Sequence, residues 1–562
     1  MRMRQWRMRW DWSKGVRRFK EDAMNTPLCP PPPFVLSTLA ILGLCPIPTC
    51  PAQGNSTSSP PAPKQPPLPE MPPPALVREA MKRAATFFRR EVSFAGGYAW
   101  EWPTDVSNAF GEDHEGVTLI MMQPPGTPSV GQANLSAWRA TQDPLYLQAA
   151  REAAQALLWC QLSSGGWDSD FEFDPRKARR YHFRRDVLAG DTDPAGRRAK
   201  SSLDDGKTES ALGFLLELAH DPASQEDAPL REALRFGFEG LLAAQAPNGG
   251  WPQRFAGPPD PAAPVGPARL PVEWPRVWPS MTYDENYTLN DNNLLEVMRL
   301  LLKAHALGQD PDCLPAARKL GDFLLLARLP EPQPGWAQQY NRDMEPVWAR
   351  KFEPPALSSI ESYGALLALA DLWAATGEEK YLAPVKPTLA WLRRSRLPDG
   401  SWARFYELGT NRPLYCKQDT YELTHEDTHL PTHYGFKIEG DLSAKLDDLE
   451  ARLAAGRETW QAKELGPVTP AQWAKRARDK RSKVREALTT LDGKGRWIDP
   501  KSGRLSARLF VQNMAVLTLY VEAGAKGGEI FTKMVLDAEA KLAREEKTRQ
   551  DKEAKTGTPA KP

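Results

Sequence analysis

A repeated helical unit limits what this 562-residue chain can fold into more than any other feature. Four segments share one plan, in which a turn rich in Asp and Gly precedes an Ala/Leu-rich helix and a short ending that closes on tryptophan. The closing residues are Trp167, Trp251, Trp336 and Trp402, which are separated by 84, 85 and 66 residues. A plan repeated in this way indicates an architecture in which each unit buries its apolar face against its neighbours.

Further apolar segments lie between the repeated units and predict helices over 208–220, 292–307 and 362–377. They are apolar around more of their circumference than an amphipathic surface helix would be, which favours inner positions. Paired buried and half-exposed helices repeated around a ring predict an all-α fold, an α/α toroid, that is an incomplete α/α barrel of helical hairpins with a helical C-terminal extension. An open helical solenoid is the structural alternative. Weaker copies of the repeat end at "GGY" (96–98) and "GRW" (495–497).

The start of the chain places a basic region before an apolar run over 34–44 that is too short to span a bilayer. We interpret it as a signal peptide for export and expect a secreted or periplasmic bacterial protein. The predicted organisation is an export signal with a basic lead (1–52), a Pro/Ser linker (53–75), a toroid catalytic domain (76–436), a helical extension whose last helix docks on the toroid (437–540) and a charged disordered tail (541–562).

The composition narrows the class of partner. The 73 basic and 71 acidic residues leave a formal charge of only +2, so no overall field attracts nucleic acid or an anionic membrane. We expect no membrane span in the mature protein, and a monomer. The chain has 19 tryptophans, whose flat apolar faces suit sugar rings, although most should fill a helical core.

Carboxylates occur at corresponding positions of two successive units. Asp204 and Asp205 immediately precede one predicted inner helix, and Asn290 and Asp291 precede the next. Inner helices of a toroid run in the same direction, so we expect these side chains to gather at one rim of the cavity.

Two interpretations of these acids stay open. Asp and Asn are favoured helix N-caps, each contributing about 1 kcal/mol, and an acid there also complements the helix dipole. Three carboxylates at one rim, however, repel one another unless a cation lies between them. Oxygen ligands without His or Cys favour calcium or magnesium over zinc, and calcium tolerates irregular geometry better. The second interpretation therefore predicts a calcium site.

The stretch "GSWARFYELGTNRPLYC" (400–416) follows the fourth tryptophan and is dense in arginine and aromatic residues. We expect its loop to return toward an inner helix, so that Arg404, Tyr406 and Arg412 reach the cavity mouth. Arginine offers a bidentate fork for carboxylates. The alternative is that Arg404 forms a surface ion pair with Glu407 that contributes less than about 1 kcal/mol.

Five motifs occur in order along the chain: "LDDGKT" (203–208), "NGGWPQRF" (248–255), "TLNDNNL" (288–294), "VWARKFE" (347–353) and "RFYELGTNRPLYC" (404–416). Together they resemble the pectate lyases of the tenth polysaccharide-lyase family, the pectic acid lyases, and they follow the family's order over roughly residues 76–436. The resemblance implies an α/α barrel that cleaves de-esterified polygalacturonate (pectate) by β-elimination with Ca²⁺, giving unsaturated oligogalacturonides.

The resemblance also implies roles for individual residues. Asp204, Asp205 and Asp291 look like the calcium- and substrate-coordinating residues, although the family usually has Asn where this chain has Asp205. The family's catalytic arginine matches Arg412, which would take the proton from C5 of a galacturonate unit. Arg350 resembles a substrate-binding arginine.

Arg404, Tyr406 and Trp251 complete the predicted substrate-binding set. The expected partner is therefore polygalacturonate or a related acidic polysaccharide.

Other readings compete with the lyase. The chain could be a catalytically inactive pectin-binding relative, or a glycoside hydrolase on the same architecture with two carboxylates flanking the scissile bond. His425, His429 and His433 are spaced as zinc ligands on a helix might be, but Pro431 interrupts such a helix, so we do not favour zinc. The acids of "DSDFEFD" (168–174) indicate a solvated turn rather than a calcium loop.

Overall fold

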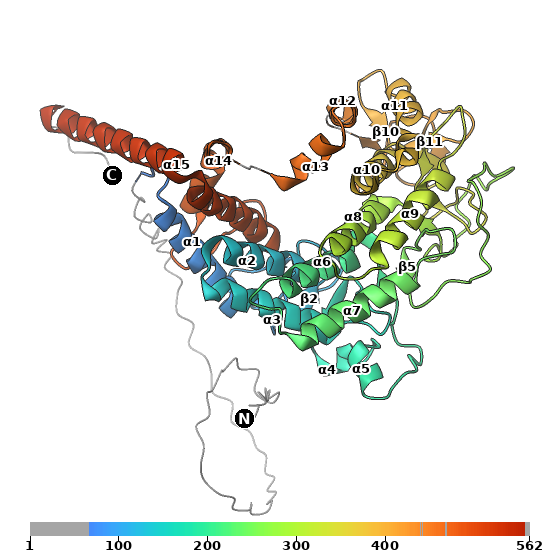
Figure 1. Cartoon of the computed structure of the whole chain (residues 1–562), viewed down its shortest axis with the longest axis horizontal. Coiled ribbons are helices and arrows are strands. Elements are labelled where there is room, and N and C mark those ends of the chain that lie inside the picture. Colours follow the sequence, from blue (N-terminus) through green and yellow to red (C-terminus); the bar gives the residue numbers. More distant parts are fainter. Residues whose placement is uncertain (1–66, 439, 441, 467–468, 557–562) are drawn as a thin grey trace, which may run out of the picture. The chain divides into compact units, whose positions relative to one another are not determined.

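The computed structural model describes residues 67–438, 440, 442–466 and 469–556. The predicted export signal, and the predicted linker up to residue 66, lie outside the described residues. The described residues belong to one unit, which consists of helical hairpins joined by loops and short strands (Figure 1). None of the helices in the described part of the chain has the length and apolar character needed to cross a bilayer.

The helices alternate between two layers, as the repeat predicts. The inner layer contains α2 (Thr127–Thr141), α6 (Lys207–Ala219), α8 (Asn293–Ala306) and α10 (Ser359–Thr376), each in contact with the next. The outer layer contains α3 (Pro144–Cys160), α7 (Ala228–Ala243), α9 (Cys313–Ala327) and α11 (Val385–Arg394), each packed on the inner helix that precedes it. This arrangement confirms the predicted all-α, α/α-toroid fold class.

The layers differ in sequence for a physical reason. The inner helix α10 is apolar on nearly every face and is buried along most of its length, whereas α11 buries only one face. Two outer helices begin at strong start signals, because Asp143 caps α3, Asp227 caps α7, and a proline follows each cap in the first turn.

The repeated tryptophans serve the core. Each donates its indole Nε1–H to a backbone carbonyl near the end of the outer helix before it, and each is fully buried. The pairs and N–O distances are Trp167 to Leu157 (3.0 Å), Trp251 to Leu241 (2.8 Å), Trp336 to Leu324 (2.8 Å), Trp402 to Leu392 (2.7 Å) and Trp497 to Ala487 (2.8 Å). The tryptophan therefore ties each loop to the helix that it leaves.

A glycine two residues before the tryptophan is required by close backbone approach. Gly249 has φ of 94°, and a Cβ there would lie 2.0 Å from the carbonyl oxygen of Lys319 in the next outer helix. Gly495 has φ of 81°, and a Cβ there would lie 2.6 Å from the carbonyl oxygen of Arg83 in α1 (Pro74–Phe87). The weak copy at 495–497 is thus a true repeat, and it packs beside the first helix of the described chain.

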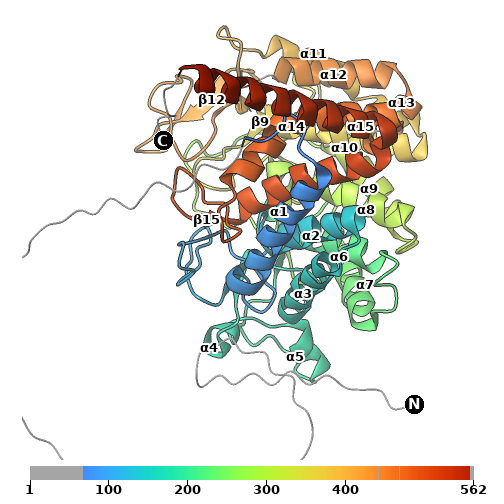
Figure 2. The same ribbon diagram turned by 90° about the vertical axis from the view of Figure 1, so that its left-hand side faces the viewer.

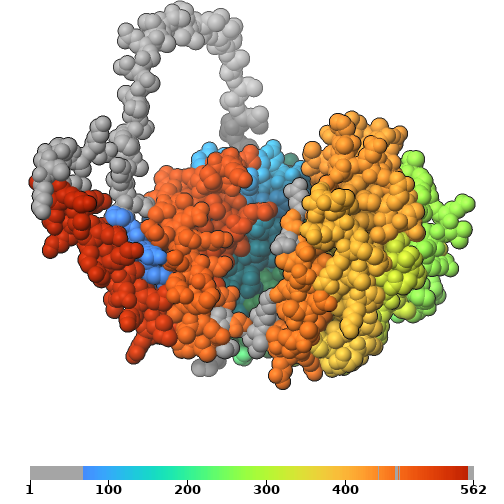
Figure 3. Space-filling model, turned by 90° about the horizontal axis from the view of Figure 1, so that it is seen from above, coloured from blue at the N-terminus to red at the C-terminus, as the bar shows by residue number. Residues whose placement is uncertain are grey.

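The C-terminal helices continue the layers. In α14 (Pro470–Thr490) and α15 (Ala507–Thr556) the hairpin repeats, and α15 packs against α1 and α2 (Figure 2). Strand β15 (Leu505–Ser506) pairs antiparallel with β1 (Glu101–Trp102). Figure 3 shows the blue surface of the N-terminal helix between the orange and red surfaces of α14 and α15. Helices α12 (Leu442–Ala454) and α13 (Arg457–Leu465) pack on α10 instead.

The predicted disordered tail is largely helical. Helix α15 turns sharply at Gly528, where φ is 54°, and then continues to Thr556, so residues 541–556 are helical. Alanine, glutamate and lysine, which dominate this segment, all have high helix propensity. Residues 557–562 lie outside the described part of the chain.

Short strands place the loops that lead into the inner helices. They pair as β2 (Leu119–Met121) with β3 (Asp170–Glu172), β4 (Ser201–Ser202) with β5 (Arg254–Phe255), β6 (Tyr287–Thr288) with β8 (Gln339–Tyr340), and β10 (Trp402–Ala403) with β14 (Lys437–Ile438). A five-stranded sheet has the order β13 (Leu423–Thr424), β12 (Pro413–Cys416), β11 (Phe405–Glu407), β9 (Ala356–Ser358), β7 (Trp336–Ala337). Strands β4, β6 and β9 lead into α6, α8 and α10, so the N-termini of these helices share one rim.

Minor elements complete the chain. They are a π-helical turn (Phe88–Val92), α4 (Pro175–Ala178), α5 (Arg184–Leu188) and 3₁₀ turns at Asp204–Gly206, Asn290–Asn292 and Glu379–Leu382.

Candidate active site

The three predicted metal-binding acids meet at this rim. Asp204, Asp205 and Asp291 each offer one carboxylate oxygen, and these three oxygens all lie within 4.8 Å of one another. Asp204 and Asp205 come from the turn before α6, and Asp291 comes from the corresponding turn before α8. The expectation that successive units bring their acids together at one rim therefore agrees with the geometry.

The same local backbone places the acids in both units. Asp205 and Asp291 have left-handed φ values of 51° and 49°, and the next residues, Gly206 and Asn292, are also left-handed, with φ of 68° and 64°. Gly and Asn tolerate this conformation best among the residues, and Asp tolerates it well. No side-chain capping hydrogen bond is present at either turn or at the inner helix that follows it, so the N-cap interpretation is wrong for these acids.

Polar neighbours hold the first two carboxylates. Asp204 accepts hydrogen bonds from Lys207 Nζ and from Gln253 Nε2, both at 2.8 Å. Asp205 accepts one from Gln123 Nε2 at 2.9 Å. Asp204 thus has a cationic partner, whereas the amide of Gln123 leaves the charge of Asp205 uncompensated.

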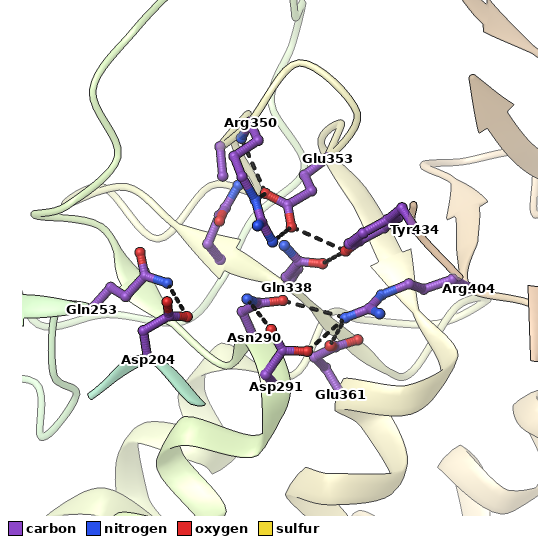
Figure 4. A network of polar contacts seen from close by, with 12 residues as sticks. Asp204, Gln253, Asn290, Asp291, Gln338, Arg350, Glu353, Glu361, Arg404 and Tyr434 are labelled. Atoms are coloured by element: carbon purple, nitrogen blue, oxygen red, sulfur yellow. Dashed lines mark hydrogen bonds and ion pairs between the residues drawn. The ribbon is translucent and has the colours of Figure 1, made fainter. Parts of the chain in front are cut away.

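A buried arginine anchors the third carboxylate (Figure 4). Asp291 accepts from Asn290 Nδ2 at 2.7 Å and from Arg404 Nη2 at 3.4 Å. The same Nη2 donates to Glu361 at 2.9 Å, and Glu361 has no exposed side-chain surface. Burial acts to lower the pKa of Arg404, but the charge of Glu361 raises it, so Arg404 stays charged. The alternative surface pair with Glu407 is wrong, because Glu407 pairs with Arg276 instead.

The cluster is electrostatically suited to a cation. Burial raises the pKa of Asp205 to about 6, and the charges of Asp204 and Asp291 add to this rise. Burial also raises the pKa of Asp291. A divalent cation would relieve this repulsion, and an all-oxygen donor set suits calcium or magnesium. The residues present therefore fit the expected ion.

Arg350 lies above the carboxylates in a second polar network (Figure 4). Its Nε donates to Glu353 Oε2 at 2.8 Å, and its Nη2 donates to Glu353 Oε1. The Oη atom of Tyr434 lies 3.0 Å from Glu353 Oε1 and 3.1 Å from Gln338 Oε1. The Tyr434 ring also carries the Arg404 guanidinium at 4.6 Å from its centroid. The network fixes Arg350 while 39% of its side chain stays exposed.

Other predicted site residues lie away from the cluster. Trp251 has no exposed surface, so its predicted sugar-stacking role is wrong. Tyr406 is 1% exposed and donates to the Ser395 carbonyl, which removes it from substrate contact. Arg404 is 7% exposed and is engaged by Glu361, so it supports Asp291 instead of facing solvent.

Arg412 is exposed at the turn between β11 and β12. Its backbone carbonyl accepts from the Glu407 backbone N–H, and among the described residues no side chain binds its guanidinium. The catalytic role of Arg412 stays a prediction.

The two lesser motifs take ordinary structural roles. His425 Nδ1 lies 2.7 Å from the Pro413 carbonyl, and within the described ranges the His425, His429 and His433 set forms no metal-sized cluster. The stretch 168–174 is wrong as a solvated turn, since it contains the buried strand β3. Its acids line a cavity that is described below.

Sequence reasoning missed several partners of the site. Gln123, Glu361 and Tyr434 lie outside the quoted motifs, and their partners are distant in the sequence. Glu353 ends the motif "VWARKFE" but was not singled out, although its partner Arg350 is only three residues away. Glu361 could have been predicted from the repeat. It lies in the first turn of the inner helix α10, close to where the acids stand before the inner helices α6 and α8.

Comparison with known proteins agrees with the motifs. The sequence model of the pectic acid lyase family matches residues 177–401, which confirms the resemblance. No curated protein matches the chain.

Among solved structures, a family 10 polysaccharide lyase from Cellvibrio cellulosa aligns with TM-score 0.40 and 19% identity over 58% of this chain and 97% of that one. A mutant of that enzyme in complex with trigalacturonic acid gives TM-score 0.39 and 19% identity over 57% and 95%. A cellobiose 2-epimerase from Bacillus thermoamylovorans gives TM-score 0.40 and 12% identity over 80% and 99%.

Proposed function

We propose that this chain, which resembles the pectic acid lyases and matches their sequence model over residues 177–401, cleaves de-esterified polygalacturonate by calcium-dependent β-elimination. The observation that carries the proposal is the convergence of Asp204, Asp205 and Asp291, whose oxygens lie within 4.8 Å of one another. The products would be unsaturated oligogalacturonides. With the signal-peptide interpretation of residues 1–52, the reaction would take place outside the cytoplasm.

Each residue of the cluster has a defined task. Calcium bound by the three carboxylates would also bind the uronate carboxylate and stabilise the negative charge that develops there when C5 loses its proton. Lys207 and Gln253 orient Asp204, and Gln123 orients Asp205. Through its hydrogen bonds to Asp291 and Glu361, Arg404 holds Asp291 in place.

The resemblance to the pectic acid lyases implies an arginine as the proton acceptor, and a base must lie within reach of the sugar. Arg350 fits this position better than Arg412, because its partly exposed guanidinium lies above the cluster and its charge acts on Asp291. Glu353 raises the pKa of Arg350 against the opposing effect of burial, so the free protein holds Arg350 protonated. A base must lose its proton before it can accept another, so we expect activity to rise toward alkaline pH.

The test is a product assay. Purified protein is incubated with polygalacturonate and Ca²⁺, and the ultraviolet absorbance of the unsaturated product is followed. We expect product with Ca²⁺, none with a chelator, and a loss of about 10²-fold or more in Asp291→Asn. Asp343→Asn, which changes an exposed acid outside the cluster, serves as the matched control.

The outcomes separate the competing functions. Saturated products that survive chelation would indicate a hydrolase. Binding of the polymer without any product, in any metal and at any pH, would indicate an inactive pectin-binding relative.

A further inference from the structure

A cavity of about 410 Å³ lies next to the carboxylate cluster. The two are neighbours, because Glu112 lines the cavity and its charge acts on Asp205, and because Arg254, which also lines the cavity, directly follows Gln253, which binds Asp204. Arg254 also pairs in register with Ser202, two residues before Asp204. The cavity therefore lies close to the cluster along the chain and in space.

One wall of the cavity offers buried acceptors. Asp168 and Asp170 line it and are only 8% and 6% exposed. Arg254 Nη2 donates to Asp168 Oδ1 at 3.2 Å, which fixes that carboxylate. The Oδ2 atom of Asp170 is buried and makes no hydrogen bond within the described ranges, although Arg180 Nη2 lies 3.6 Å from it. A buried acceptor of this kind suits a ligand hydroxyl.

The lining of the cavity also includes exposed cations. Arg198 and Lys200 line the cavity and are exposed. In the described part of the chain the Arg198 guanidinium has neither a hydrogen bond nor an ion pair; it lies 5.9 Å from the centroid of the Tyr181 ring, and its charge acts on Asp170. Lys200 Nζ approaches its nearest carboxylates, Asp284 and Glu285, only to 3.9 Å. Both cations therefore have capacity for an anion.

Resting on the proposed function, we propose that this cavity is a subsite for a second uronate unit of the same acidic polymer. Arg198 and Lys200 bind the carboxylate of that unit, and Asp168 and Asp170 accept hydrogen bonds from its hydroxyls. A methyl ester carries no charge for Arg198 and Lys200, so the subsite selects a de-esterified unit.

The test is calorimetric binding of hexagalacturonate and trigalacturonate to the full chain, with Ca²⁺ and with a chelator. The variant is the double change Arg198→Ala and Lys200→Ala. The matched control is Arg176→Ala with Arg179→Ala, which removes the same charge from exposed positions of the same segment that do not line the cavity. All four residues are exposed or sit in loops, and circular dichroism verifies that both variants fold.

We expect the cavity variant to lose about tenfold or more of the affinity for hexagalacturonate, and the control to lose less than about twofold. Methyl-esterified hexagalacturonate should bind both proteins equally weakly. Unchanged hexamer affinity in the cavity variant, or an equal loss in the control, overturns the subsite. If the wild type forms no product yet binds the hexamer with this pattern, the lyase proposal fails and the subsite stands.

Discussion

Replacing Asp205 by asparagine should make the calcium-free protein more stable and should lower the affinity for calcium. The pKa of Asp205 rises from 3.8 to about 6 in the folded chain, mainly through burial and then through Asp204 and Asp291. That rise corresponds to about 3 kcal/mol at about 1.4 kcal/mol per pKa unit. Because part of the Asp205 side chain still faces solvent, screening reduces the effect, and we expect about 1 to 2 kcal/mol.

The direction with pH follows from proton binding. The folded state binds more protons than the unfolded state between about pH 4 and pH 6, so the free energy of unfolding falls as pH rises through this window. Asp205→Asn removes this fall. The left-handed backbone at this position also suits asparagine, so the substitution adds no strain.

Urea unfolding of the wild type and of Asp205→Asn at pH 4 and pH 7.5, in chelator and in Ca²⁺, measures both effects. We expect the variant to gain about 1 to 2 kcal/mol at pH 7.5 in chelator and little at pH 4. In Ca²⁺ the variant should gain less stability than the wild type does, because it binds the ion less tightly. Asp343→Asn controls for the loss of one charge. A variant that is less stable in chelator at pH 7.5 would refute the reasoning.

Three further predictions address the fold and the arginines. Gly249→Ala should destabilise the fold by more than about 2 kcal/mol, because its Cβ would clash with the Lys319 carbonyl. Gly308→Ala, where φ is 70° and no atom lies near, should destabilise it by about 1 kcal/mol. Equal values for the two variants in urea unfolding would contradict the close-approach argument. Arg404→Ala should lower the free energy of unfolding by about 3 to 5 kcal/mol, because it leaves the buried Glu361 without its cationic partner. The control Arg342→Ala, which breaks the exposed pair with Asp260, should lower it by less than about 1 kcal/mol. An equally small loss in Arg404→Ala would show that the buried pair does not stabilise the rim. Arg350→Lys should lower kcat by about 10²-fold or more, and Arg412→Lys by less than about tenfold. The reverse order in the product assay would show that Arg412, as the sequence predicts, is the base.

The sequence predicts the ring of hairpins well because its signals are local. A turn, a helix and a closing tryptophan recur at each unit, and the acids before two inner helices share one phase with that repeat. A helix start fixes where its preceding residues lie, so the meeting of Asp204, Asp205 and Asp291 could be anticipated. The N-cap alternative fails because no side-chain capping hydrogen bond forms at either turn or at the helix that follows it, and Asp205 and Asp291 have a left-handed backbone.

The repeat itself indicates that Trp251 is a core residue. A tryptophan that recurs at the same place in every unit, including Trp497, belongs to the packing of the unit, and the indole hydrogen bond to the preceding helix explains the recurrence. The residue type alone suggests that Trp251 stacks on a sugar, but its repeated position indicates a packing role.

Long-range partners could not be predicted in this way. Glu361 and Asp291 meet Arg404 from positions 43 and 113 residues away in the sequence. Tyr434, which lies 81 residues from Glu353, joins the network only after the chain has folded. Arg404 of the stretch 400–416 reaches Asp291 and Glu361 but is buried, and the turn between β11 and β12 places Arg412 at an exposed position that no local pattern revealed.

The central claim is that Asp204, Asp205 and Asp291 together bind one divalent cation. Calorimetric titration of the purified chain with CaCl₂, in the presence of trigalacturonate, tests it most directly. We predict one bound calcium ion per chain in the wild type and none in the triple variant Asp204→Asn, Asp205→Asn, Asp291→Asn. Equal calcium binding by the two proteins would contradict the account.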